Sequence, residues 1–253
     1  MPTDDRTVLA VTGADRQSFL QGLVTNDVAQ ADHGLVHAAL LTPQGKYLAD
    51  FFLLTKGDAI LLDVKAELAG AVMKRLAMYR LRARVAIDRT EMVVSRGPGV
   101  APAGAFSDPR HPALGWRAYG AAAPALPEVD WDAIRVAHCI PETGIELIPD
   151  ETYILEAGFE RLHGVDFRKG CYVGQEVTAR MKHKTDLRKG LALVSVDGPA
   201  ESGTGITAEG KPVGTLFTRA GNQAIAYLRF DRADGPMQAG AAVIRFLRPG
   251  EDC

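Results

Sequence analysis

Two kinds of hydrophobic spacing alternate along this chain, and their order constrains the fold more than any other feature. In residues 66–79, Leu68, Val72 and Leu76 recur every fourth residue, which is the spacing of one face of a helix. Strand-like segments precede and follow this helix, at residues 46–55, 59–64 and 80–88 and near residue 97. The resulting β-β-α-β-β order predicts an α+β fold, in which helices cover one side of an antiparallel sheet.

The segment at residues 80–88 alternates strictly between apolar and basic residues, which predicts a strand with two unlike faces. Arg80, Arg82 and Arg84 would share one of these faces. Such a face is typical of a solvated sheet surface, and the alternative is a site for a polyglutamate tail.

The rest of the chain divides into segments with different residue patterns. The expected elements are a strand at residues 7–13, a helix at 14–27 with Asp15 as its N-cap, a strand at 34–42, an irregular linker at 98–129, a helix at 130–139, a short strand at 165–167 and a helix at 174–183. After Leu187, four short alternating segments joined by turns predict a small β-barrel or sandwich.

Composition excludes several classes of protein. The net charge of −2 offers no overall basic field for nucleic acid or an anionic membrane, and no apolar run approaches the roughly 20 residues that span a bilayer. The three cysteines are too few for a disulfide framework, and the chain contains no CxxC, no HExxH and no zinc-type Cys/His spacing. The first residues resemble neither a signal nor a transit peptide. We therefore expect a cytoplasmic monomer without a metal site, a membrane span or a nucleic-acid partner.

Cys171 lies in the most informative stretch, "FRKGCYVGQEVTAR". Arg168 and Lys169 precede it, and the N-terminus of a predicted helix follows it; both features favour a thiolate, which is the nucleophilic form of cysteine. Gly170 and Gly174 permit close approach or positive φ. The alternative is that Cys171 is only a small turn residue, and composition alone fits both interpretations.

The eight residues "KGCYVGQE" resemble the KGCYxGQE signature of the folate-binding YgfZ-type family, whose members are relatives of the aminomethyltransferase (T-protein) of glycine cleavage. That family includes the mitochondrial factor for late iron–sulfur cluster assembly. The segments "FLQGLVTNDV", "LLTPQGKYLADFFL" and "HGVDFRKGCYVGQEVTARMKH" extend the resemblance over most of the chain. It is weakest between residues 98 and 130.

This resemblance implies a three-part ring of T-protein type. Its parts would be a discontinuous α+β domain at residues 1–45 and 130–186, a ferredoxin-like domain with linker at 46–129, and a C-terminal β-barrel at 187–253. Tetrahydrofolate, or a related reduced folate, would bind in the central hole. By its position in "GKYLADFF", Asp50 would meet the reactive end of the folate.

The resemblance also implies further site residues. Cys171 and Lys169 would carry the chemistry, and the candidate folate ligands beside Asp50 are Asn26, Tyr172, Gln175 and Arg180. Turn capping is the alternative for Asn26, and ordinary packing is the alternative for Tyr172. The chain departs from the family pattern in "RVAHCIP", where Ala137 replaces a glutamate and Cys139 a glycine, and in Lys184–Thr185, where a glycine is usual. The first departure affects the expected binding of the folate pterin, and the second affects the turn after the helix.

The function implied is that of a folate-binding accessory protein for the assembly or repair of iron–sulfur clusters, with iron–sulfur carrier or client proteins as partners. The main alternative is a tetrahydrofolate-dependent one-carbon transferase, so the sequence leaves open whether the protein is an enzyme. A thiol oxidoreductase is disfavoured because the chain lacks CxxC.

Overall fold

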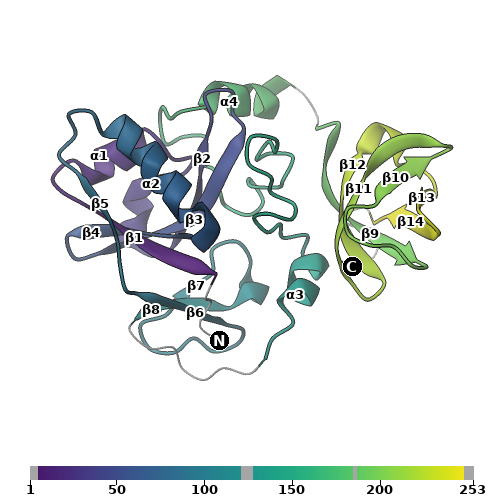
Figure 1. The fold of residues 1–253 in the computed structure, drawn as a ribbon, viewed down its shortest axis with the longest axis horizontal. Coiled ribbons are helices and arrows are strands. Elements are labelled where there is room, and N and C mark those ends of the chain that lie inside the picture. Colours follow the sequence, from purple (N-terminus) through teal and green to yellow (C-terminus); the bar gives the residue numbers. More distant parts are fainter. Residues whose placement is uncertain (1–4, 121–127, 185–186, 248–253) are drawn as a thin grey trace. The chain divides into compact units, whose positions relative to one another are not determined.

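The segment order expected between residues 46 and 97 is present in the computed structural model, which describes residues 5–120, 128–184 and 187–247 (Figure 1). The chain divides into two compact units. The first consists of residues 1–129, 149–151 and 159–177, and the second of residues 130–148, 152–158 and 178–253.

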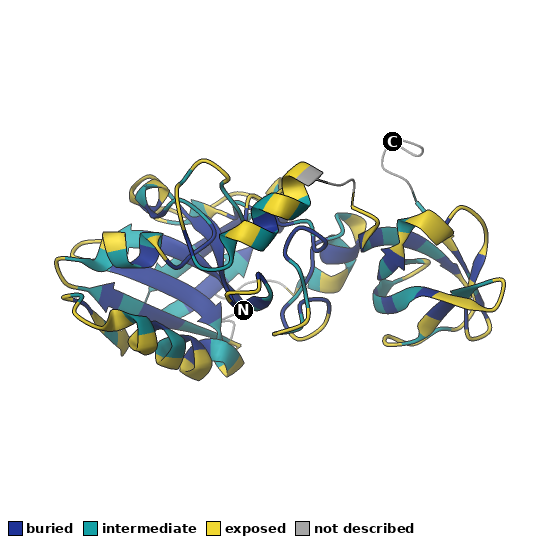
Figure 2. Ribbon diagram, turned by 90° about the horizontal axis from the view of Figure 1, so that it is seen from above, coloured by how far each residue is buried: buried dark blue, intermediate teal, exposed yellow. Residues whose placement is uncertain are grey.

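A five-stranded antiparallel sheet forms the centre of the first unit. Its spatial order is β2-β3-β4-β1-β5, and its strands are β1 (Arg6–Thr12), β2 (Val36–Leu41), β3 (Tyr47–Lys56), β4 (Ala59–Lys65) and β5 (Ala86–Arg89). Every residue of β2 is buried, as expected for a strand that is covered on both faces. Figure 2 shows this burial as a dark blue band along the central strands.

Two helices cover one face of the sheet, α1 (Arg16–Gln21) and α2 (Ala66–Arg80). Val72 and Leu76 of α2 are buried against sheet residues such as Phe51 and Leu53, and Leu20 of α1 joins the same cluster. The spacing of apolar residues at 66–79 therefore predicted this packing correctly. A short 3-10 helix, η1 (Val28–Asp32), follows α1, and Asp27 caps it by accepting a hydrogen bond from the Ala29 N–H.

The other face of the sheet carries buried charges. A small sheet packs here, with strands β6 (Val93–Gly97), β7 (Phe106–Ser107) and β8 (Trp116–Gly120) in the order β6-β8-β7 and a 3-10 turn, η2 (Pro112–Leu114), before β8. Asp63 accepts from Arg6 Nε at 2.6 Å, from Arg117 at 2.9 Å and from the Tyr119 hydroxyl at 3.0 Å. Arg117 also donates to Asp108. A buried carboxylate is tolerated when it is paired in this way.

A closed six-stranded barrel dominates the second unit. Its order is β10-β11-β12-β9-β14-β13, and its elements are β9 (Lys189–Asp197), β10 (Gly205–Ala208), β11 (Lys211–Ala220), β12 (Gln223–Arg229), η3 (Phe230–Arg232), β13 (Met237–Ala239) and β14 (Ala242–Phe246). The helix α3 (Trp131–Ala137) packs beside β11. The expected C-terminal barrel is thus confirmed, with six strands in place of the four that alternation predicted.

Several local predictions were wrong. Helix α2 continues to Arg80, and Leu81 follows it with a φ of +38° and 89% exposure, so no strand begins before Ala86 and no arginine face exists at 80–84. Alternation misled at the start of the segment, where Leu81 is exposed, whereas Ala83, Val85 and Ile87 do pack against the core. The segment 98–129 was expected to be irregular, yet it contributes β7 and β8. The helix expected at 14–27 ends at Gln21, and residues 165–167 form no strand.

The predicted domain boundary at residues 45 and 46 lies in the turn between β2 and β3, which pair in one sheet. The division into three domains remains a prediction. The turn at Lys184–Thr185 and the third cysteine, Cys253, involve positions outside the described residues.

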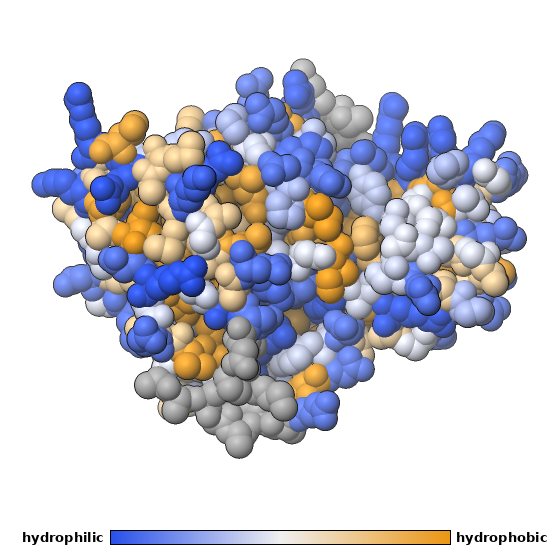
Figure 3. Space-filling view, viewed as in Figure 1, coloured by the Kyte–Doolittle hydropathy of each residue, from blue (hydrophilic) through white to orange (hydrophobic). Residues whose placement is uncertain are grey.

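Hydrophilic side chains cover most of the face drawn in Figure 3, with small groups of hydrophobic residues between them. Among the residues that the structure describes, no helix has the length and hydropathy needed to cross a bilayer.

Candidate functional site

The signature residues 169–174 form a loop that leads into α4 (Gln175–Lys184). Cys171 is a free and exposed cysteine. Gly170 has a φ of +97°, and among the described residues nothing lies within 4 Å of the place where its Cβ would stand. The thiol is therefore accessible to a partner, because little bulk surrounds it.

Gly174 has the opposite surroundings. Its φ is +85°, and a Cβ at this position would lie 2.5 Å from the Thr42 carbonyl oxygen and 3.0 Å from Leu41 Cβ. The loop thus lies directly on the β2–β3 connection, which explains why this position needs glycine. Gly170 and Gly174 both adopt positive φ, but only Gly174 lies against another part of the backbone.

Gln21, at the end of α1, holds the loop through reciprocal hydrogen bonds with Lys169. Lys169 Nζ donates to the Gln21 carbonyl at 2.5 Å, and Gln21 Nε2 donates back to the Lys169 carbonyl at 3.1 Å. Gln21 Nε2 also donates to Asp27 Oδ1 at 3.1 Å, while Gln21 Oε1 accepts from the Val28 N–H at 2.9 Å. We call this arrangement the Gln21–Lys169 clamp. It joins segments that lie 148 residues apart in sequence.

Lys169 is the cation that interacts with Cys171. Burial lowers the pKa of Lys169 from 10.5 to about 8, against opposing attraction from Asp27, Asp166 and Cys171. Its ammonium also lies 4.8 Å from the centre of the Tyr172 ring. Arg168, the other cation expected to act here, is 95% exposed and lies 3.9 Å from Asp166.

Tyr172 and Gln175 bind each other at the start of α4. The Tyr172 N–H donates to Gln175 Oε1 at 3.0 Å, and the Gln175 N–H donates to the Tyr172 carbonyl at 3.3 Å. Tyr172 is buried. This geometry favours turn formation for both residues. Their contact with folate remains a prediction, as does that of Arg180, an exposed residue of α4 that belongs to the second unit.

Asp50 lies in a second cluster of the first unit, on the sheet face opposite α2. Its Oδ1 accepts from the Tyr47 hydroxyl at 2.8 Å, and its Oδ2 lies 3.3 Å from His37 Nε2. His37 Nδ1 lies 3.1 Å from the Leu162 carbonyl oxygen. Sequence reasoning missed His37, and the available signal was a single histidine within the fully apolar run of β2.

Asn26 connects this cluster to the segment before the signature loop. Its amide nitrogen donates to the carbonyls of His37 at 2.8 Å and of His163 at 2.7 Å, and its oxygen accepts from the Asp27 N–H. Both amide hydrogens are therefore used within the protein. This favours the turn-capping interpretation, and a role for Asn26 as a folate ligand remains a prediction.

The departure at Ala137 and Cys139 lies at the end of α3 in the second unit. Cys139 has a φ of +49°. A buried carboxylate is nevertheless present nearby: Glu146 accepts from Arg135 at 3.1 Å and from the Thr218 hydroxyl at 2.5 Å. Glu146 ties Arg135 to β11, and sequence reasoning missed this role.

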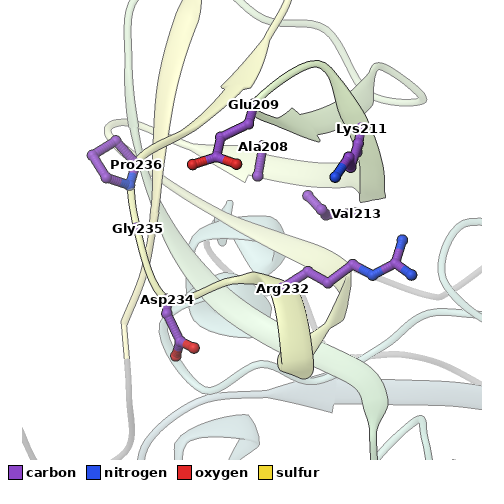
Figure 4. Close-up of a pocket in the computed structure, with 8 residues that line it drawn as sticks. All are labelled: Ala208, Glu209, Lys211, Val213, Arg232, Asp234, Gly235 and Pro236. Atoms are coloured by element: carbon purple, nitrogen blue, oxygen red, sulfur yellow. The ribbon is translucent and has the colours of Figure 1, made fainter.

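The barrel carries a separate hollow of about 450 Å³. Its lining residues are Ala208, Glu209, Lys211, Val213, Arg232, Asp234, Gly235 and Pro236 (Figure 4). Acidic and basic side chains both line it, and none of the predicted site residues belongs to it.

Comparisons with known proteins agree with the resemblance to iron–sulfur cluster assembly factors. A family model described as the CAF17 C-terminal β-barrel domain matches residues 188–251. The iron–sulfur cluster assembly factor IBA57 of human mitochondria is 31% identical, covering 94% of this chain and 80% of that protein. Its mouse counterpart is 30% identical, with 92% and 78% covered. The mitochondrial IBA57 homologue of Mycosarcoma maydis is 30% identical, with 75% and 55% covered.

A crystal structure of the glycine cleavage aminomethyltransferase T of Bartonella henselae superposes with a TM-score of 0.75, covering 98% of this chain and 84% of that chain at 12% identity. This match confirms the T-protein-type fold. The expected cytoplasmic location is contradicted, because the human, mouse and fungal relatives are all named as mitochondrial proteins.

Proposed function

Because this chain belongs to the IBA57 family of iron–sulfur cluster assembly factors, we propose that it is a folate-binding member of the YgfZ type that presents Cys171 to an iron–sulfur carrier or client protein. The observation that carries this proposal is an exposed thiol on a loop that the Gln21–Lys169 clamp holds against α1. A thiolate is both a nucleophile and a soft ligand for iron, so the reactive group fits a cluster or sulfur species held by a partner.

Lys169 supports this role for Cys171. Its ammonium is close enough to attract the thiolate, and the Gln21–Lys169 clamp fixes the backbone on which both residues lie. A nearby cation favours the reactive form of cysteine. Lys169 would therefore act through electrostatics, and Cys171 through direct contact with the partner's cargo.

The folate part of the proposal rests on Asp50. Its carboxyl group is oriented by Tyr47 and His37, and it lies on a strand that resembles the T-protein segment. A fixed, buried carboxyl group suits recognition of the amine and ring nitrogens of a reduced pterin. The four other candidate ligands are Asn26, Tyr172, Gln175 and Arg180, and they are secondary to Asp50.

The test of the thiol compares Cys171→Ser with Cys139→Ser, the other described cysteine, in a strain that lacks the gene. We expect Cys171→Ser to fold normally and to lose most rescue of iron–sulfur enzymes, with glycine cleavage unaffected. Cys139→Ser should rescue. Full rescue by a folded Cys171→Ser protein would mean that Cys171 is only a turn residue.

The test of the ligand is calorimetry with tetrahydrofolate. We expect saturable binding that weakens in Asp50→Asn and is unchanged in Asp58→Asn, an exposed aspartate in the turn after β3. The competing function is a folate-dependent one-carbon transferase, for which the T-protein-type fold is the only support. Loss of one-carbon transfer with normal iron–sulfur enzymes in the deletion strain would favour that function.

A further inference from the structure

We infer that His37 and Asp50 hold a shared proton inside the first unit, and that His37 is the positioning residue that fixes the Asp50 carboxyl group. The inference deepens the proposed folate site, and it depends on that proposal only where ligand binding is concerned. It starts from two distances, 3.1 Å from His37 Nδ1 to the Leu162 carbonyl oxygen and 3.3 Å from His37 Nε2 to Asp50 Oδ2.

The first distance fixes one hydrogen. A carbonyl oxygen can only accept, so Nδ1 of His37 must donate to Leu162. The neutral ring has one N–H, and if it lies on Nδ1, then Nε2 presents a lone pair to Asp50. An ionised carboxylate also presents only lone pairs, and two acceptors repel each other at this distance.

One further proton resolves this conflict. Either His37 is an imidazolium that donates to both neighbours, or Asp50 is a carboxylic acid that donates to Nε2. The two arrangements contain the same number of protons and differ only in which atom carries the shared one. Each places a hydrogen between His37 Nε2 and Asp50 Oδ2, and each leaves the pair without net charge.

Burial favours this neutral pair. His37 is 2% exposed and Asp50 is 6% exposed, so an unpaired charge on either residue would be costly. The His37 ring centre lies 4.9 Å from that of Phe159 and 5.6 Å from that of Phe52. A Cβ on Gly164 would lie 2.9 Å from His37 Nδ1, so the ring packs directly beside Gly164, where a larger residue would not fit.

Other polar and charged groups of the described residues also act on this pair. Tyr47 donates to the other oxygen of Asp50, and Arg6 on β1 lies close enough to attract Asp50 electrostatically. The guanidinium of Arg6 is itself held by Asp63. Arg110 and Arg117 lie over the Phe52 ring, and both pair with Asp108. These three arginines share two carboxylates, Asp63 and Asp108, so a net positive charge remains. It favours the arrangement in which Asp50 is ionised and His37 carries the shared proton.

The Asp50 carboxyl group therefore has a fixed orientation. Tyr47 holds one oxygen and His37 the other, while Leu162 holds the far side of the ring. Leu162 lies on the segment that leads to the Cys171 loop. His37 thus joins the strand carrying Asp50 to the chain carrying the thiol, and a reduced heterocycle with N–H and ring-nitrogen groups would meet an acid group already in place.

The deciding experiment is nitrogen and carbon NMR of the wild-type protein. His37 is identified among the six histidines by the signal lost in His37→Gln, and Asp50 by the carboxyl signal lost in Asp50→Asn. At neutral pH we expect a hydrogen on Nδ1 of His37 and a second one on either Nε2 or the Asp50 carboxyl group. A bare Nδ1, or a neutral ring beside an ionised Asp50 with no hydrogen on Nε2, would overturn the inference.

Ligand binding is measured separately so that the two proposals can fail independently. If tetrahydrofolate binds, His37→Gln should weaken it by about tenfold or more, the loss expected for one hydrogen bond to a charged or acid group. The matched control is His33→Gln, because His33 is exposed in the same unit. Equal affinity of His37→Gln and wild type would remove the positioning role. Absence of folate binding to the wild type would remove the folate proposal and leave the NMR result to decide the shared proton.

Discussion

Replacing Gln21 by alanine tests whether the Gln21–Lys169 clamp holds the Cys171 loop in its working position. Gln21 is not expected to touch a ligand or a partner. Its side chain makes three hydrogen bonds, to the Lys169 carbonyl, to Asp27 and to the Val28 N–H. The substitution removes all of them and keeps the Gln21 carbonyl, so Lys169 Nζ retains its own acceptor.

The magnitude follows from these contacts. A partly buried hydrogen bond contributes about 0.5–1.5 kcal/mol, and an unsatisfied partner adds to the loss. Since Lys169 is only partly buried, its carbonyl can regain water, whereas the N–H of buried Val28 loses its acceptor; we expect a total loss of about 2–3 kcal/mol. With its side-chain tie to Gln21 removed and only backbone acceptors of α1 left, the loop samples other positions. We therefore expect rescue of iron–sulfur enzymes to fall by more than the change in folded protein alone explains.

The assay is urea unfolding, followed by rescue of a deletion strain at matched protein level. Gln30→Ala is the matched control, because Gln30 lies exposed on η1, nine residues along the same segment. It should change the free energy of unfolding by less than about 0.5 kcal/mol. The reasoning is refuted if Gln21→Ala and Gln30→Ala have the same stability, or if Gln21→Ala loses stability and still rescues fully.

Three further predictions follow from other contacts. Asp63→Asn should lower the free energy of unfolding by about 3–5 kcal/mol, because it removes the carboxylate that pairs with buried Arg6 and leaves Arg117 with Asp108 alone. In the same urea unfolding measurement, Asp58→Asn at an exposed turn should change the free energy of unfolding little. Gly174→Ala should destabilise the protein more than Gly170→Ala: both add strain of about 1–3 kcal/mol at positive φ, but only the former drives a methyl group into backbone. Between about pH 8 and pH 10.5, the wild type should gain stability relative to Lys169→Met as pH rises, because the unfolded chain then holds a proton that folded Lys169 has lost. A flat difference over that range would contradict the lowered pKa of Lys169.

The parts of the fold that sequence could predict are those in which local spacing and burial agree. Helix α2 is one such part, since Val72 and Leu76 repeat at helical spacing and both are buried. The strands β10 and β13 were missed because four and three residues are too few for alternation to be recognised. The segment at 80–88 failed for the opposite reason, because its alternation is clear and yet Leu81 has no core to face.

In the candidate site, sequence likewise predicted the residues of a local motif and missed those with distant partners. Cys171, Lys169 and the glycines lie within six residues, so a local motif was enough to find them. Gln21 and His37 act through partners 148 and 125 residues away, and no local pattern reports such distances. A polar residue buried in a strand requires a hydrogen-bond partner, so His37 within an apolar run does predict that one exists. The sequence pattern cannot identify that partner, because the partner depends on how the segment before the signature loop lies against β2. A histidine in a buried strand is therefore a reason to search for a distant acid and carbonyl, and the His37–Asp50 contact is where that search ends in this chain.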